Sequence, residues 1–203
     1  MQATRGTAIA DSTLVVRRSP RGLRLLFAGV ALTGLVLDIA TKVLAMAYLD
    51  GSRPVRLLGG LLHLHLVRNP GAAFSLGEKY TVVFAALSIL VLVFVLVRLV
   101  PKIGHAGWSV ALGLLTAGVA GNLGDRLFRD PGFLHGHVVD FLQLPRWPIF
   151  NVADMCITAA AVAIMFLSVV RNVTLDGRRY IRPAKEPSAG SAAESPQTEA
   201  EQP

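Results

Sequence analysis

Four long apolar runs constrain the fold of this chain more than any other feature. A helix needs about 20 apolar residues to cross the hydrocarbon core of a bilayer. Four stretches reach this length, at roughly 23–49, 80–100, 107–128 and 149–170. The chain is 53% hydrophobic and 16% charged, whereas a typical soluble domain is about 25% charged. The sequence therefore predicts a polytopic membrane protein with four transmembrane helices.

The first run has an alternative interpretation as a cleaved signal peptide. Arginines precede it, and the tripeptide "AMA" at 45–47 mimics a cleavage site. The apolar region of a signal peptide spans about 7–15 residues, however, and this run is far longer. It also contains Asp38 and Lys42. We therefore interpret it as a retained helix.

The net charge of +7 indicates membrane orientation rather than binding to nucleic acid. The basic residues gather at the ends of the apolar runs, where membrane topology places them. Twelve of the twenty lysines and arginines lie before the first run, between the second and third, or after the fourth. The positive-inside rule then places both termini in the cytoplasm.

The chain divides into one membrane domain and two tails. We place the four-helix domain at 21–172 and a disordered cytoplasmic segment at 1–20. The cytoplasmic tail at 173–203 begins with basic residues and continues with Pro, Ser, Ala, Glu and Gln. Such a composition buries too little apolar surface to offset the entropy of ordering, so we expect disorder there.

Polar residues in and beside the apolar runs converge on the outer end of the predicted bundle. They are Asp38 and Lys42 in the first run, Asn122, Asp125 and Arg126 in the third, Asn151 and Asp154 in the fourth, and Asp140 in the preceding loop. Ionisable groups at membrane depth are costly and usually mark a functional site. The convergence therefore predicts a site near the extracytoplasmic face.

We expect different roles for individual residues of this group. Asp38 and Lys42, spaced i, i+4, share a helix face, and a structural ion pair is as plausible for them as a direct role in chemistry. For Asp125 and Arg126 we favour roles in supporting and orienting the site. Asp154 has no basic residue within one helical turn in the sequence, which favours a functional role.

The sequence of the first outer loop predicts that part of the loop forms a small sheet on the outer membrane face. Residues 61–67, "LLHLHLV", alternate as a half-exposed strand does. The Asn-Pro-Gly that follows is typical of a turn. His63 and His65 share a strand face, but without a convincing third ligand we favour interfacial histidines over a metal site. The single cysteine, Cys156, excludes an internal disulfide.

Five motifs together resemble the lipoprotein signal peptidases, also called signal peptidase II. They are "DIATK" at 38–42, "RNPGAAFS" at 68–75, "GNLGDR" at 121–126, "VVDF" at 138–141 and "FNVAD" at 150–154. The resemblance covers roughly residues 20–172. It implies an all-α membrane protein with four transmembrane helices, a small extracytoplasmic β-cradle and an outer amphipathic loop. The segment 127–137 is longer than the family suggests, so the shape of that loop is not carried over.

The resemblance also implies an activity and its residues. The activity is removal of the signal peptide from bacterial prolipoproteins, just before a cysteine carrying a diacylglyceryl group. Asp140 and Asp154 match the catalytic aspartates. Substrate-orienting roles fall on Asn69, Gly71, Asn122, Arg126 and Asn151, and supporting roles on Asp38, Lys42 and Asp125. The expected partners are prolipoproteins and membrane lipids, with a monomeric protein, no cofactor and no metal.

Two neighbouring acids suit such a reaction physically. Hydrolysis without a metal or a nucleophile needs one group to accept a proton from water and another to donate one to the departing group. Two close carboxylates that share a proton can do both, because their like charges push their titrations apart.

Three other functions compete with this interpretation. A proton-coupled transporter predicts charges near the bilayer midplane, whereas these cluster at one end. An assembly scaffold leaves the paired acids unexplained. A serine peptidase built on Ser75 and the loop histidines lacks a nucleophile motif.

Overall fold

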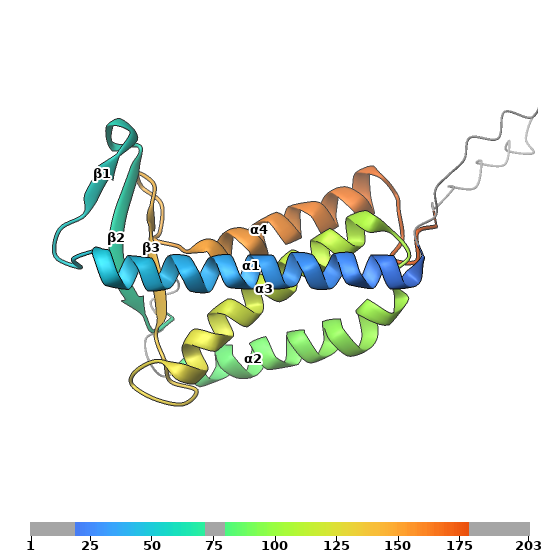
Figure 1. Ribbon diagram of the computed structural model, residues 1–203, viewed down its shortest axis with the longest axis horizontal. Coiled ribbons are helices and arrows are strands. Elements are labelled where there is room, and N and C mark those ends of the chain that lie inside the picture. The colour runs from blue at the N-terminus through green and yellow to red at the C-terminus, as the bar shows by residue number, and fades with distance from the viewer. Residues whose placement is uncertain (1–18, 72–79, 179–203) are drawn as a thin grey trace, which may run out of the picture.

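The computed structural model describes residues 19–71 and 80–178, which form four helices and a small sheet (Figure 1). The helices are α1 (Pro20–Tyr48), α2 (Thr81–Phe94), α3 (Ala106–Phe128) and α4 (Val152–Met165). Further helical turns at Val95–Leu99 and Val100–Lys102 extend α2, and a turn at Phe166–Val170 extends α4. The strands are β1 (Val55–Leu57), β2 (Leu62–Asn69) and β3 (Val138–Gln143).

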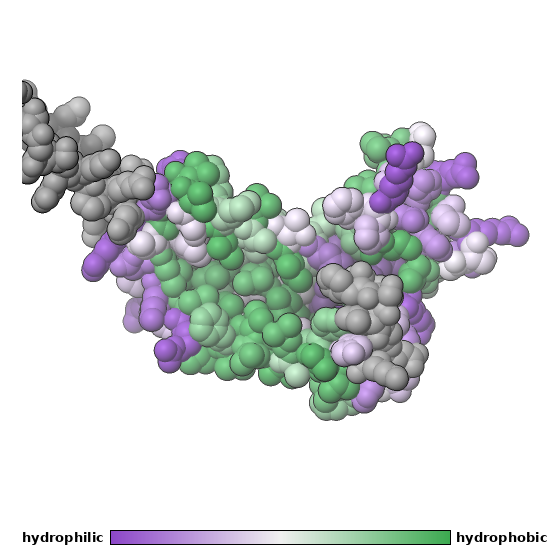
Figure 2. Space-filling view, turned by 180° about the vertical axis from the view of Figure 1, so that it is seen from behind, coloured by the Kyte–Doolittle hydropathy of each residue, from purple (hydrophilic) through white to green (hydrophobic). Residues whose placement is uncertain are grey.

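All four predicted membrane spans are present. With their extensions, the four helices are each long and apolar enough to cross a bilayer. Figure 2 shows a broad hydrophobic band along the bundle, between hydrophilic ends. The predicted tails 1–20 and 173–203 fall mostly on residues 1–18 and 179–203, which lie outside the described residues.

The fourth helix begins later than the sequence pattern indicates. Its first residue is Val152 rather than 149, although Ile149 and Phe150 are apolar. Asn151 caps the helix instead, since asparagine accepts a hydrogen bond from an otherwise unpaired backbone N–H. Phe150 pairs with Leu142 at the edge of the sheet. The prediction of a helix from 149 is therefore wrong by three residues.

Close contacts of α3 with α1 and α4 hold the bundle together. Gly118 lies against the backbone of Ala153 and the side chain of Ile157 on α4. Gly113 lies against Phe27 and Val30 on α1. Helices in a bilayer gain little from the hydrophobic effect, so small residues that let backbones approach stabilise their association. The α2 helix packs on α3 at the edge of the bundle.

The three strands form an antiparallel sheet in the order β1-β2-β3 across one end of the helices (Figure 1). The alternation at 61–67 is confirmed as a strand, since it lies almost entirely within β2. One face of β3 carries Val139 and Phe141, which pack against Ala45 near the end of α1. The opposite face carries Val138 and Asp140. The sheet therefore rests one face on the end of α1 and presents Asp140 on the other face, toward the cavity lined by α2, α3 and α4.

The close approach of α3 to α4 predicts different outcomes for two glycines of α3. A methyl group at Gly118 would overlap the carbonyl oxygen of Ala153, whereas one at Gly124 meets no atom within 4 Å. We expect Gly118→Ala to lower the free energy of unfolding by about 1–3 kcal/mol through overpacking. The control Gly124→Ala should leave it unchanged or raise it by up to about 1 kcal/mol through helix propensity. Denaturation in detergent measures both, and equal stability of the two variants would contradict the packing described.

Candidate active site

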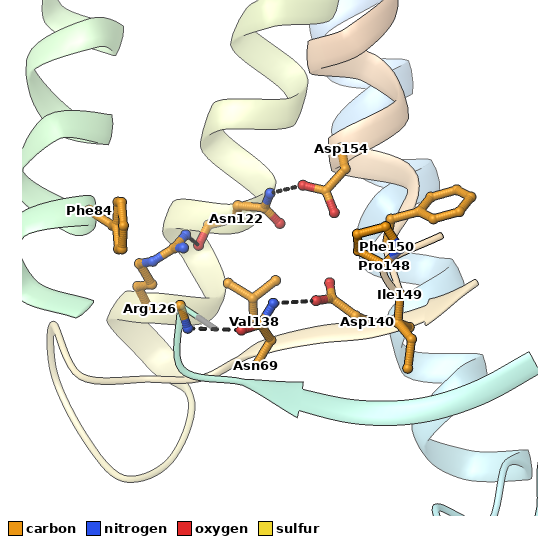
Figure 3. A pocket seen from close by; sticks show the side chains of 11 residues that line it. Asn69, Phe84, Asn122, Arg126, Val138, Asp140, Pro148, Ile149, Phe150 and Asp154 are labelled. Carbon is orange, nitrogen blue, oxygen red and sulfur yellow. Dashed lines mark hydrogen bonds between the residues drawn. The ribbon is translucent and has the colours of Figure 1, made fainter. Parts of the chain in front are cut away.

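A cavity of about 300 Å³ lies where the sheet meets the helices. Its walls come from β2, β3, α2, α3, α4 and the link before α4 (Figure 3). It brings together six of the ten residues singled out in the sequence: Asn69, Gly71, Asn122, Arg126, Asp140 and Asp154. Six of the residues that the sequence predicts to form one site therefore line one cavity.

Asp154 is fixed at the start of α4 by a capping box. The Asp154 N–H donates to Oδ1 of Asn151 at 2.9 Å, and the Asn151 N–H donates to Oδ2 of Asp154 at 3.1 Å. This reciprocal pair satisfies two backbone donors that a helix start leaves open. The other carboxylate oxygen, Oδ1, accepts from Nδ2 of Asn122 at 2.8 Å. Local helix chemistry thus explains how an acid is tolerated at the head of an apolar run.

Asp140 approaches the same cavity from β3. Its Oδ1 accepts from Nδ2 of Asn151 at 2.6 Å, and its Oδ2 accepts from Nδ2 of Asn69 at 2.8 Å. In Figure 3 the carboxylates of Asp140 and Asp154 lie on neighbouring walls and point into the space between them. Asn151 touches both acids, one through its backbone N–H and the other through its side-chain amide. This asparagine therefore couples the positions of the two carboxylates.

The surroundings of Asp140 favour its protonated form. The pKa of Asp140 is raised to about 6, mainly by burial and in part by the neighbouring charge of Asp154. The hydrogen bonds from Asn69 and Asn151 act in the opposite direction, because they stabilise the carboxylate. Burial outweighs them, since only 2% of Asp140 is exposed. One acid of the pair therefore titrates close to neutral pH.

Gly71 and Asn69 form the turn that the sequence predicts after β2. The Gly71 N–H donates to Oδ1 of Asn69 at 2.9 Å. This bond fixes the amide so that Nδ2 faces Asp140. Gly71 has φ of 120°, a conformation that residues with a Cβ rarely adopt. The rest of the motif, residues 72–75 with Ser75, lies outside the described residues.

Lys42 sits behind the cavity and is 1% exposed. Its ammonium lies 2.8 Å from Oδ2 of Asp38 and 2.8 Å from Oδ2 of Asp125. It also donates to Oδ1 of Asn122 at 3.2 Å. Because Oδ1 of Asn122 accepts from Lys42 and from Asn151, its Nδ2 is left to face Asp154. Lys42 therefore sets the orientation of the amide that holds Asp154.

Asp38 and Asp125, which pair with Lys42, also hold the backbone next to Asp154 and Asp140. Oδ1 of Asp38 accepts from the Ala153 N–H at 2.8 Å, next to Asp154. Oδ2 of Asp125 accepts from the Val139 N–H at 3.2 Å, next to Asp140. Asp38 and Lys42 form an ion pair and do not line the cavity. Of the two possibilities left open for this pair, the geometry favours structural support.

Asp125 and Arg126 diverge although they are adjacent in sequence. Asp125 pairs with Lys42 and Arg129. Arg126 turns into the cavity, donates to the backbone oxygen of Asn122 at 3.0 Å and lies 5.8 Å from the ring centroid of Phe84. Its Nε has no hydrogen-bond partner among the described residues. The guanidinium is therefore placed to bind a ligand in the cavity.

Phe84 lines the cavity but lies outside the five sequence motifs. It lies in α2, where nearly every side chain is apolar, so no contrast with its neighbours distinguishes it. Its ring supports the guanidinium of Arg126 through a cation–π contact. The loop histidines lie elsewhere: His65 contacts the carbonyl of Gly51, and His63 lines a different cavity.

Comparison with known proteins identifies the family. A sequence model described as Signal peptidase (SPase) II matches residues 30–170. The chain belongs to the signal peptidase II family. The lipoprotein signal peptidase of Leifsonia xyli subsp. xyli is 43% identical over 176 residues, which cover 86% of this chain and 79% of the relative. That of Mycobacterium avium is 46% identical over 160 residues, covering 78% of this chain and 86% of the relative.

A solved bacterial membrane enzyme shares the fold of this signal peptidase II. Its TM-score is 0.63 at 26% sequence identity, over 75% of this chain and 96% of that one. The family, the four-helix fold with its small sheet, and the assignment as a hydrolase are confirmed. The protein is a bacterial multi-pass membrane protein.

The buried position of Lys42 predicts a large effect of its removal. Lys42→Met leaves Asp38 and Asp125 without their shared ammonium. Removing one partner from a buried ionic group costs about 3–5 kcal/mol, so the free energy of unfolding should fall by that order. The exposed Lys102 at the other end of the bundle provides the control Lys102→Met. Similar stability of the two variants would show that the cluster does not support the site.

The raised pKa of Asp140 predicts a titration that infrared spectroscopy can follow. The protonated carboxyl band, identified by its loss in Asp140→Asn, should disappear as the pH rises through about 6. In Asp154→Asn this titration should move to lower pH, because a neighbouring negative charge is removed. A band that titrates near the ordinary pKa of about 3.9, and does not move in Asp154→Asn, would contradict the coupling of the two acids.

Proposed function

We propose that this chain removes the signal peptide from bacterial prolipoproteins, cleaving just before a cysteine that carries a diacylglyceryl group. Asp140 and Asp154 are the catalytic pair of this proposal. The observation that carries it is the double contact of Asn151, which bonds to both carboxylates at the wall of one cavity. The names of the relatives, lipoprotein signal peptidases, support the substrate class.

In the proposed mechanism the two acids activate a water molecule between them. The ionised member of the pair accepts a proton from water as the water attacks the scissile carbonyl carbon. The protonated member donates its proton to the carbonyl oxygen, which gives a tetrahedral diol. The proton taken from water then passes to the departing nitrogen as the carbon–nitrogen bond breaks, and a diol hydroxyl returns a proton to the acid that gave the first one. The raised pKa of Asp140 supports this division, because an acid with a pKa of about 6 can release and take back a proton close to neutral pH. The pair titrates as a unit, so neither acid is assigned one role throughout.

Binding and catalysis fall to different residues in this proposal. Asn69, Asn122 and Asn151 direct amide donors at the acids, so they position the catalytic pair. Arg126 has its guanidinium in the cavity and is placed to hold the substrate backbone. Phe84 keeps that guanidinium in place.

We further propose that both termini lie in the cytoplasm, with the site near the extracytoplasmic face. The asymmetry of lysine and arginine between the two sides supports this orientation. The position at the end of the helices lets water reach the acids, while the signal helix and lipid of the substrate remain in the bilayer. We expect the enzyme to act as a monomer.

Removal of either acid should abolish cleavage without disturbing insertion. Asp140→Asn and Asp154→Asn keep the shape of each side chain but remove its ability to exchange a proton. General acid–base catalysis contributes on the order of 10²–10⁴-fold, so turnover of a diacylglyceryl-modified prolipoprotein should fall by at least 10²-fold. The purified enzyme in detergent or nanodiscs is assayed by the shift in mobility of the substrate.

Two controls make this test specific. Asp130→Asn changes an acid whose side chain is 90% exposed, and it should retain normal turnover. The unlipidated precursor should be cleaved poorly by the unmodified enzyme. Near-normal turnover in either active-site variant would rule out the proposed pair. Equal cleavage of the unlipidated form would rule out the proposed substrate class.

A further inference from the structure

The sheet extends away from the cavity into a hairpin that the catalytic proposal does not use. The hairpin tip, defined as residues 55–64, contains β1, the connecting turn and the first three residues of β2. It projects sideways past the helices (Figure 1). Exposed leucines concentrate there: Leu58 is 76% and Leu61 is 62% exposed. Exposed apolar patches usually mark a binding surface.

The strand register separates the hairpin tip into two chemically distinct faces. Leu64 pairs with both Val55 and Leu142, and Leu62 pairs with Leu57. Paired residues share a face, so these five apolar side chains lie together. They share that face with Asp140, which is two residues from Leu142 on β3. The apolar face is therefore the one that carries Asp140, which lines the cavity together with residues of α2, α3 and α4.

The other face of the hairpin tip is polar and basic. Arg56, His63 and Gln143 form one cross-strand row. Together with Arg146 they line a second cavity, of about 370 Å³. Neither 51–71 nor 141–150 contains an acidic residue, whereas the two stretches hold four arginines. Charge complementarity therefore favours an anionic partner.

We propose that the hairpin tip lies in the headgroup layer of the adjacent leaflet and binds anionic phospholipids there. The hydrocarbon core of a bilayer is about 30 Å thick, and headgroups increase this to about 40–45 Å. A sheet within that layer meets acyl chains with its leucine face and headgroup phosphates with Arg56 and Arg146. Trp147, which is 62% exposed beside Arg146, suits the same depth, because tryptophan concentrates at membrane interfaces.

The continuity of this surface with the helices supports the bilayer as its occupant. The exposed sides of the helices form a hydrophobic band that a bilayer must cover (Figure 2). The sheet lies across the end of those helices (Figure 1), and its apolar face carries Asp140, which lines the cavity with residues of α3 and α4. A leaflet that covers the helices therefore reaches the hairpin tip without a further partner.

Site-directed spin labelling can measure the depth of the hairpin tip without any substrate. In a Cys156→Ala background, a nitroxide is attached at Leu61→Cys, and in a separate protein at Ser52→Cys as the matched control. Ser52 is exposed at the same end of the bundle. The full chain is reconstituted in bilayers rich in phosphatidylglycerol or made of phosphatidylcholine alone. The measured quantity is the ratio of accessibility to oxygen over accessibility to a water-soluble nickel chelate.

We expect this ratio to be several-fold higher at position 61 than at 52 in the anionic bilayers, and lower in phosphatidylcholine. The double variant Arg56→Gln/Arg146→Gln should remove the difference between the two lipids. A label at Val55→Cys repeats the measurement where Leu61→Cys does not fold.

Three results would overturn the proposal. Equal accessibility of positions 61 and 52 to nickel in both lipids would place the tip in water. Shielding that requires added prolipoprotein would assign the surface to the substrate. Equal shielding in both lipids, unchanged by the arginine substitutions, would exclude anionic headgroups. None of these depends on whether Asp140 and Asp154 are catalytic, since the enzyme is not turning over.

Discussion

The structure depends on holding two carboxylates close together at the end of an apolar bundle. Like charges in a partly buried site repel, and each carboxylate also loses hydration. Amide donors from three elements and a capping box offset this cost: Asn69, Asn122 and Asn151 each donate to one of the acids. Neutral donors hold both acids in place, and neither acid forms an ion pair with a lysine or arginine among the described residues. A lysine in the same place would form an ion pair and lower the pKa of the acid it touches.

The positive charge is placed one layer further back. Lys42 is shared by Asp38 and Asp125, and these two acids bond to the backbone of Ala153 and Val139. The buried cluster thus connects α1 and α3 to the residues immediately beside Asp154 and Asp140. Buried ionic groups often add little stability compared with apolar packing. Their value in this enzyme is geometric, because they fix the register of four elements around one cavity.

The sequence predicts the helices and strands well, but it predicts the contacts between them less completely. Apolar length alone identifies the four spans, and period-two alternation identifies β2, because both signals are local. The start of α4 was misplaced because Phe150, though apolar, belongs to the sheet edge. The divergence of Asp125 from Arg126 and the role of Phe84 depend on which side chains approach from other helices. No pattern within one segment reports such tertiary partners.

The register of β2 shows how a single irregularity serves the site. Leu64 pairs with Leu142, but Val67 pairs with Asp140, so β2 contains one extra residue between these pairs. Such a bulge moves every later side chain of the strand to the opposite face. Without it, Arg68 would point into the cavity, and Asn69 would point away from Asp140. The same bulge leaves Leu62 and Leu64 on the side of the bundle. One extra residue therefore allows a single face of the sheet to carry leucines at its distal end and, at the other end, the amide of Asn69 that holds Asp140.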